Sequence, residues 1–571
     1  MKNSLFLGLA LLGAATVPCV ASYAGQQSGG SIVLLNAHIY TPAGWKQAVA
    51  IKDGAIVAIG SNREVAAKAP AGAKKVDLGG KTVFPGLHDM HVHPMGAGAQ
   101  MTECHFSQEA TPAQVIDAVA RCVASKKPRE WVTGGQWQGI SFGDAGPNKA
   151  MLDKIAPNNP ILLTDVSGHS SWANSAALKI AGVNKDTPNP QGGVIERDTA
   201  GEPTGILREA ASQLVASRVP PATPAQNAAS LKRALDQLLS TGVTTLVDAL
   251  VAPPIAQAYD DLDSKGELVQ QVRGCLVYGR SPGPQISFDQ VLASRGKYER
   301  ANFRPDCVKV FMDGVPTAGH TAALLEPYAD NPPGMTDSGR EKGILMVSPS
   351  ELDPLVTKWD KMGLTVKFHA VGDAASKAVL DAIAAARKAN GPNGPLHDVA
   401  HLTLLAKDQV ARAKPLRATF EFSPYLWFPT IINDEQLKAV GPNLMSRAWP
   451  VREAIDSGAL VVVGSDWPTG TPTANPWIGM ETLVTRRVPG DPGTGPAIAA
   501  NEAITLKEAV DLFTINGARQ MGDAKVRGSI EIGKIADLIV LDRDPFAVPI
   551  SDVHNTNVLK VFIKGRQVFA R

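Results

Sequence analysis

Three of the eleven histidines lie within six positions of one segment, FPGLHDMHVHP, residues 84–94. An apolar run and a Pro-Gly break precede them, as is typical of a strand that ends in a polar loop. Residues two apart on a strand share a face, so His91 and His93 can direct two imidazole nitrogens to one metal ion while His88 points elsewhere. A lone H-x-H pair is common in solvated loops, so the metal interpretation depends on finding further ligands.

Further candidate ligands stand at the ends of later strand-like runs. They are Lys309 in VKVFMDG, His369 in VKFHAVGD, His401 in VAHLT and Asp466 in VVVGSDWP. With the two histidines above, this set is too large for one catalytic zinc but suits two ions roughly 3.5–4 Å apart, and histidine-rich ligation favours zinc over magnesium. A free ammonium cannot bind a metal, so Lys309 would have to be modified, and carbamylation by CO₂ would turn it into a bridging carboxylate. The alternative is an ordinary lysine paired with Asp313.

Eight apolar strand candidates alternate with helical stretches along the middle of the chain. They are TVFPGLHDMHVH, GVTTLVDA, QQVRGCLVYG, CVKVFMDG, LTVKFHAVGD, HDVAHLTLL, RATFEFSP and ALVVVGSDWP. Such alternation predicts an α/β fold with a parallel sheet, and the count fits a closed (β/α)₈ TIM barrel, in which active-site groups gather at the C-terminal strand ends. Every candidate ligand lies at that end.

The spacing of the strands predicts the domain organisation. The first two are separated by roughly 150 residues where one βα unit needs about 30, which predicts a subdomain inserted after strand 1, at about residues 95–240, over the barrel mouth. Residues 31–84 and 516–571 carry short β-like runs, including a KDG hairpin signal, and neither segment is large enough for its own core. We expect the two to form one small sandwich and residues 85–515 to form the barrel with its insert.

The amino terminus and the charge balance bear on location and partners. Residues 1–24 combine one lysine, a short apolar run and small residues, the pattern of a secretory signal peptide that is too short to span a bilayer, with cleavage after Ala21 or Ala24. We expect an exported protein, periplasmic or secreted, without stable membrane insertion after cleavage. The formal net charge is +2, from 56 basic and 54 acidic residues, and no block of lysine or arginine interrupts the chain, which argues against nucleic acid as a partner.

Cysteine usage does not indicate a disulfide framework. Signal cleavage removes Cys19 and leaves four cysteines in a long chain. A Cys104–Cys122 bridge is compatible with an oxidising compartment, whereas Cys275 and Cys307 lie in apolar strand-like runs and are predicted to be buried thiols. None of the spacings suggests a cysteine zinc site.

The motifs taken together resemble the amidohydrolase superfamily. The segments are FPGLHDMHVHP, PILLTDVSGHSSWANSAAL, GEPTGILREAA, GVTTLVDA, VKVFMDG, TAALLEPYAD, KFHAVGDAA, GSDWP and GSIEIGKIADLIVLDRDP. Specifically they resemble amidohydrolase family 3, the branch that includes N-substituted formamide deformylases, and the likeness runs from about residue 31 to the C-terminus. It implies a metal-dependent hydrolase with a distorted (β/α)₈ barrel and a composite N- and C-terminal β-sandwich.

The resemblance also implies a role for each candidate ligand. His91 and His93 would bind the first metal, and the second would be held by the two later histidines, His369 and His401. Carbamylated Lys309 would bridge two zinc ions. Asp466 would contact the first metal and act as the proton shuttle.

Two positions depart from the family pattern. Members commonly have Glu-His-Ala where this chain has Ala400-His401-Leu402, so the contact expected from that Glu is missing and the orientation of His401 is open. His320 stands where other residue types are usual, which leaves substrate specificity open.

We expect an exported amidohydrolase that cleaves an amide-type C–N bond of an N-acyl or N-formyl small molecule by a metal-activated hydroxide. Asp466 would move the proton, and His169 of the insert would hydrogen-bond the developing oxyanion. Candidate substrate contacts are Trp172, Asn174, His320 and Trp467. For His169, Trp172 and Asn174 the alternative is a core or capping role. A homo-oligomer is compatible with the sequence.

Three other functions compete with this one. A mononuclear-metal deaminase of the same superfamily needs no lysine but wants a Glu a few residues past the strand-five histidine, where this chain has Asp373. Lys309 as a Schiff-base nucleophile is disfavoured by the surrounding histidines. A non-catalytic exported binding or regulatory protein on this scaffold is disfavoured by the complete ligand set.

Overall fold

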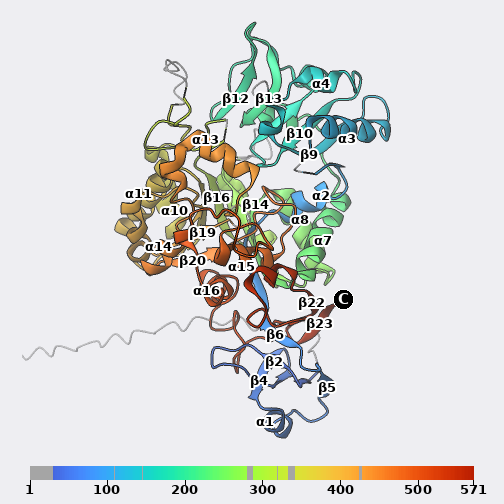
Figure 1. Ribbon diagram of the computed structural model, residues 1–571, viewed down its shortest axis with the longest axis vertical. Helices are drawn as coiled ribbons and strands as arrows, with labels where there is room; N and C mark the ends of the chain where they lie inside the picture. Colours follow the sequence, from blue (N-terminus) through green and yellow to red (C-terminus); the bar gives the residue numbers. More distant parts are fainter. Residues whose placement is uncertain are drawn as a thin grey trace, which may run out of the picture.

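The computed structural model describes residues 30–107, 110–143, 146–279, 287–317, 319–331, 341–423 and 427–571. The expected signal segment and Cys19 lie outside these residues. The chain forms a central barrel with the inserted subdomain at one end and the sandwich at the other (Figure 1). In the described part of the chain, no helix combines the length and the apolar character needed to cross a membrane.

Eight parallel strands form the barrel, and each predicted strand is confirmed. In spatial order they are β7 (Leu87–Val92), β14 (Val243–Val251), β15 (Gln271–Val277), β16 (Phe303–Phe311), β17 (Thr365–Ala370), β18 (His397–His401), β19 (Ala418–Phe422) and β20 (Leu460–Val463). The first predicted strand is split at Gly86: the four residues before it form β6 (Thr82–Pro85) of the sandwich, and those after it form β7. The strand that carries the H-x-H pair therefore connects the sandwich to the barrel.

The first and last strands meet through backbone contacts beyond the end of β20. The Asp466 N–H donates to the His91 carbonyl at 2.6 Å, and the His93 N–H donates to the Trp467 carbonyl at 2.9 Å. Gly464 allows this approach, because a Cβ at that position would lie 2.2 Å from the His91 nitrogen. We call this contact between the first and last strands the barrel seam. It places Asp466 beside His91 and His93, although Asp466 is far from both in sequence.

Helices cover the outside of the barrel. They include α7 (Pro224–Ser240), α8 (Pro253–Ser264), α10 (Pro349–Lys361), α11 (Asp373–Asn390), α13 (Ile431–Met445) and α15 (Pro476–Thr485), whereas α17 (Ile515–Gln520) packs below the strands. Helix α7 shows why such a segment is helical: Thr223 caps it in a capping box with Gln226. Its buried residues Leu231, Leu235 and Leu238 recur at helical spacing and join the barrel core.

The inserted subdomain is built on a six-stranded mixed sheet. Its strands, in spatial order, are β12 (Gly193–Arg197), β13 (Pro203–Glu209), β11 (Ser170–Ala173), β10 (Ile161–Asp165), β9 (Val132–Trp137) and β8 (Cys104–His105). Helix α3 (Pro112–Ala124) packs near its β8 edge, and the fold has its own apolar clusters. Helix α2 (Pro94–Gln100) packs on α7, which belongs to the barrel layer. The insert is therefore narrower than the expected 95–240, and spans about residues 101–223.

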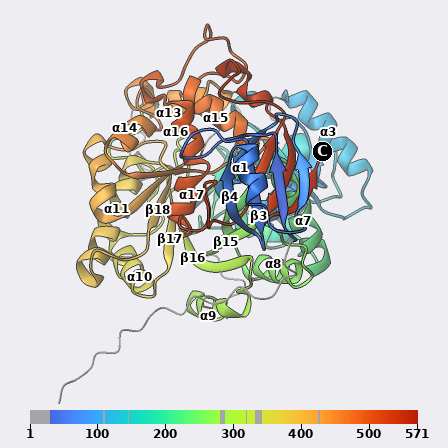
Figure 2. The ribbon, with the colours of Figure 1, turned by 90° about the horizontal axis from the view of Figure 1, so that it is seen from below.

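The two chain ends form the expected sandwich. One sheet contains β1 (Ile32–Leu35), β3 (Ala48–Lys52), β4 (Ala55–Gly60) and β5 (Lys74–Asp77), and the other contains β2 (His38–Ile39), β6, β21 (Leu538–Leu541), β22 (Val558–Ile563) and β23 (Arg566–Ala570). N-terminal Leu34 and Val83 share one core with C-terminal Leu538 and Phe562. The strands from both ends lie side by side beneath the barrel (Figure 2).

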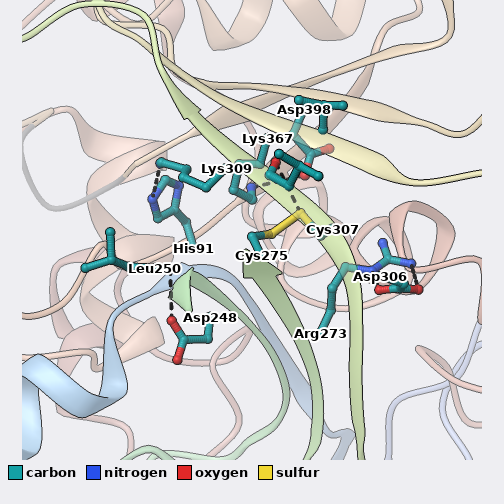
Figure 3. The surroundings of a disulfide bond; sticks show 12 residues. His91, Asp248, Leu250, Arg273, Cys275, Asp306, Cys307, Lys309, Lys367 and Asp398 are labelled. Atoms are coloured by element: carbon teal, nitrogen blue, oxygen red, sulfur yellow. Dashed lines mark hydrogen bonds and ion pairs between the residues drawn. A yellow bond between two sulfur atoms is a disulfide. The ribbon is translucent and has the colours of Figure 1, made fainter. Parts of the chain in front are cut away.

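Two disulfides join the four remaining cysteines. Cys104 and Cys122 are bridged within the insert. The prediction of buried thiols at Cys275 and Cys307 is wrong, because β15 and β16 pair in a register that sets these two residues opposite each other, and they form a disulfide within the barrel (Figure 3).

We expect Gly464→Ala to destabilise the barrel seam, because its methyl group would overlap the backbone of His91 in β7. The loss should be about 2 kcal/mol or more, measured by denaturant unfolding, together with weaker metal retention. Gly296→Ala is the matched control, since a Cβ there has no neighbour within 4 Å. Equal stability of the two variants would contradict the seam geometry.

Candidate metal centre

The six candidate ligands gather at the C-terminal ends of the barrel strands, as predicted. His91, Lys309, His369 and His401 belong to β7, β16, β17 and β18, and the remaining two follow β7 and β20. This is the end of a (β/α)₈ barrel at which active sites are built.

The first group consists of His91, His93 and Asp466, whose ligand atoms all lie within 4.8 Å of one another. Asp466 Oδ1 lies 3.0 Å from His93 Nε2 and 3.6 Å from His91 Nε2. Lys309 Nζ lies 3.2 Å from the same His91 nitrogen. Two imidazole nitrogens and a carboxylate converging on one point are a donor set that fits a zinc-like divalent cation.

The second pair, His369 and His401, adjoins the first group. Their ring centroids are 4.4 Å apart, and the His401 ring lies 4.6 Å from that of His91. Burial, then nearby cationic groups, lowers the pKa of all three well below the usual value. These imidazoles are therefore neutral, which is the form that binds metal.

Glu421 is a central residue of the site that sequence reasoning missed. Its Oε2 lies 2.5 Å from His91 Nδ1, and the side chain is fully buried. Burial raises the pKa of Glu421 to about 7, against the opposing effect of Lys367 at 3.5 Å. By holding Nδ1, Glu421 directs His91 Nε2 towards the centre. The sequence feature that could have identified Glu421 is that it is the one acidic residue inside the apolar strand RATFEFSP.

Ser423 is an orienting partner of His401. Its Oγ lies 2.8 Å from His401 Nδ1 and donates to Glu421 Oε1 at 3.2 Å. The departure at Ala400 therefore does not leave His401 without an orienting partner.

Lys309 is buried beside His91, and Lys367 lies nearby (Figure 3). Lys367 pairs with Asp398 at 3.1 Å as well as with Glu421. The alternative pairing of Lys309 with Asp313 is wrong, because the Asp313 carboxylate instead accepts the backbone N–H groups of Ala323, Val371 and Gly372.

Two of the candidate ligands have strained backbones. His401 has a φ of 73° and Asp466 a φ of 56°, in the left-handed region that side chains other than Gly rarely adopt. Such strain persists where the surrounding structure fixes it, and it concentrates at functional sites.

His169 of the insert reaches the pocket beside the centre. Its ring lies 4.8 Å from that of His369, and its Nδ1 lies 2.8 Å from Glu209 Oε2. Burial alone would lower the pKa of His169, but the charge and hydrogen bond of Glu209 raise it overall. The pocket is lined by Ser167, His169, Val315, Pro316, Thr317, His369, Val371, His401, Thr403, Ser423, Ile432, Gln436, Trp449, Asp466, Thr469 and Gly470.

The expected substrate contacts of Trp172 and Asn174 are wrong. Trp172 is fully buried in an apolar core of the insert. Asn174 is the N-cap of α5 (Ser175–Ala181) and donates to two backbone carbonyls, so it too is structural.

His320 and Trp467 are also absent from the described pocket lining. His320 pairs with Asp330 at 2.8 Å and stacks on Tyr328, and Trp467 is buried at the seam. Their expected substrate contacts are therefore not found among the described residues.

Comparison with known proteins gives three findings. The model of the amidohydrolase family matches residues 74–569. The N-substituted formamide deformylase of Arthrobacter pascens is 30% identical over 94% of this chain and 97% of its own length, and Protein LONG AFTER FAR-RED 3 of Arabidopsis thaliana is 30% identical over 91% and 88%. A solved metal-dependent hydrolase from Pyrococcus horikoshii is similar with a TM-score of 0.70 at 23% identity, covering 91% of this chain and 99% of that one, which supports the fold.

We predict that Glu421→Gln weakens metal binding about 10–100-fold, because the amide cannot hold His91 as the carboxylate does. Competition with a chelator, followed by elemental analysis, measures this. Glu481→Gln is the matched control, since Glu481 is a buried acid that binds His554 Nδ1 at 2.8 Å away from the centre. The same loss of metal in both variants would show a general loss of stability instead.

Proposed function

The chain belongs to the amidohydrolase family and is a metal-dependent hydrolase acting on carbon–nitrogen bonds, and from this premise we propose that it cleaves the amide-type bond of an N-formyl or N-acyl small molecule at a two-zinc centre. The observation that carries the proposal is the convergence of two adjoining histidine pairs with Lys309 and Asp466 at one end of the barrel. One ion needs only three protein ligands, so this larger set favours two.

Each group in the centre has a proposed place. His91 and His93 with Asp466 would hold a first ion, His369 and His401 would hold a second, and Lys309, once carbamylated, would supply a carboxylate ligand. Such ions lower the pKa of a bound water and polarise a carbonyl oxygen. Glu421 and Ser423 hold the histidine rings in the orientation that this requires.

Asp466 and His169 carry out the proton and charge steps. Asp466 accepts the proton of the attacking water and delivers it to the leaving nitrogen. His169 faces the same pocket and donates a hydrogen bond to the oxygen on which negative charge develops. The products are a carboxylic acid and an amine.

The competing functions find less support in this arrangement. Asp373, which the mononuclear deaminase would use, instead accepts the Leu325 N–H at 2.8 Å at the start of α11. A retired scaffold would be expected to lack ligands, and the full set is present. Lys309 lies against an imidazole that faces the centre, an unsuitable place for a Schiff-base nucleophile.

The proposal is tested by metal content and turnover of the purified protein prepared with and without bicarbonate. We expect close to two zinc ions per chain, hydrolysis of 4-nitroformanilide or 4-nitroacetanilide, and loss of both in Lys309→Ala. Short carboxylic acids should partly restore the activity of this variant, since they replace the bridging carboxylate. One tight ion that is insensitive to Lys309 would support a mononuclear enzyme, and no bound metal would contradict the catalytic function.

We further propose that the protein is exported to the periplasm or the medium. Disulfides persist in oxidising compartments and are rare in the cytosol, and the two in this chain agree with the signal-like amino terminus.

The intact mass of the protein purified from its native host tests this proposal. We expect a chain that begins after Ala21 or Ala24 and is lighter than the reduced form by the four hydrogens that two disulfides remove. A full-length chain with all five thiols free would contradict export.

A further inference from the structure

We propose that Glu209 is a positioning residue for His169, and that through this pair the inserted subdomain forms part of the active site. The inference rests on the proposed hydrolytic function and extends it. Glu209 holds Nδ1 of the imidazole and leaves Nε2, the nitrogen on the other side of the ring, for the substrate in the pocket.

The local fold of the insert brings the two residues together. His169 immediately precedes β11 (Ser170–Ala173), and Glu209 ends β13 (Pro203–Glu209), which runs antiparallel to it. The Glu209 N–H donates to the His169 carbonyl at 2.8 Å, and the side chains meet at 2.8 Å. Backbone and side chain therefore both fix this pair, which lies mostly buried.

The second carboxylate oxygen of Glu209 ties the insert to the barrel. Thr321 Oγ1 donates to Glu209 Oε1 at 2.8 Å, and the Thr321 carbonyl accepts the Gly314 N–H at 2.9 Å. The Gly314 carbonyl in turn lies 3.1 Å from His369 Nε2. A series of contacts thus runs from His169 through Glu209 and Thr321 to His369, whose ring lies beside that of His169.

The backbone conformations of Glu209 and Gly314 allow the insert and the barrel to meet closely. Glu209 itself has a φ of 50°, an uncommon conformation for this residue type. At Gly314 a Cβ would lie 2.1 Å from Glu209 Oε1, so only glycine lets the carboxylate approach. The strained backbone of Glu209 and the glycine at position 314 both indicate that the Glu209 carboxylate is held specifically in this place.

The contact between Glu209 and His169 affects how the imidazole can act. A carboxylate that accepts the Nδ1–H fixes the tautomer and the ring orientation and stabilises positive charge on the imidazole. His169 Nε2–H can then donate to developing negative charge with no reorganisation at the moment of reaction. The insert without Glu209 would still fold on its own apolar clusters, but its histidine would be free to rotate.

A double-mutant cycle separates positioning from a structural role. His169→Ala, Glu209→Gln and the double variant are loaded with zinc and assayed with 4-nitroformanilide, and their metal content and thermal midpoint are recorded. Glu196→Gln is the control, since Glu196 is an acid of the same subdomain that pairs with Arg208 near its surface. Thr321→Val and Thr321→Ser test the link to the barrel without touching the acid.

We expect Glu209→Gln to lower kcat about 10²–10³-fold, as the loss of one oxyanion donor does, with little change in KM and unchanged metal content. The double variant should be no slower than His169→Ala, because Glu209 acts through His169. Thr321→Ser should keep wild-type kcat while Thr321→Val lowers it, and Glu196→Gln should match wild type.

Other outcomes overturn specific parts of the account. Additive losses in the double variant, or a Glu209→Gln variant that loses metal or stability beyond the control, would give Glu209 another role and overturn this inference. Wild-type activity in His169→Ala would remove His169 from the mechanism while leaving hydrolysis intact. A fully metal-loaded wild type that hydrolyses neither nitroanilide would instead overturn the proposed function, and the inference with it.

Discussion

The pairing of charges buried inside the barrel is the constraint on which the site depends. Glu421, Lys367 and Asp398 are all fully buried, and Lys367 pairs with both carboxylates. Removing one partner of such a buried pair costs about 3–5 kcal/mol, because the other charge is left without compensation. Lys367 therefore favours the charged form of Glu421 that holds His91, and Asp398 holds Lys367 in place.

This paired set continues through the barrel to its opposite end. Asp398 accepts both hydrogen bonds from the Gln520 amide at 2.8 Å, and Gln520 contacts Arg273, which pairs with Asp306 at the partly exposed end of the series. Gln520 belongs to α17, a helix packed below the strands, so the barrel floor and the catalytic end are connected through polar contacts. Two further features contribute to the same centre. The contact between the first and last barrel strands aligns Asp466 with His91, and the inserted subdomain brings the His169 ring next to that of His369.

The ligands and the barrel strands could be predicted from the sequence, because each ligand directly follows or ends an apolar run, and strand ends meet in a parallel barrel. The features that sequence analysis missed depend on the register between neighbouring strands. Register decides that the Glu421 side chain points into the barrel. It also sets Cys275 opposite Cys307, although the two are 32 residues apart in the chain. Glu209 required the topology of the insert, and Trp172 resembled a site residue only by its closeness in sequence to His169.

The central claim is that this buried set supports a centre of two metal ions bridged at Lys309. Anomalous diffraction from crystals of the zinc-loaded protein, recorded on both sides of the zinc absorption edge, tests it most directly. We predict two peaks, one between His91, His93 and Asp466 and one at His369 and His401, with density for a carbamylated Lys309 between them. A single peak, or an unmodified Lys309 with no metal beside it, would contradict it.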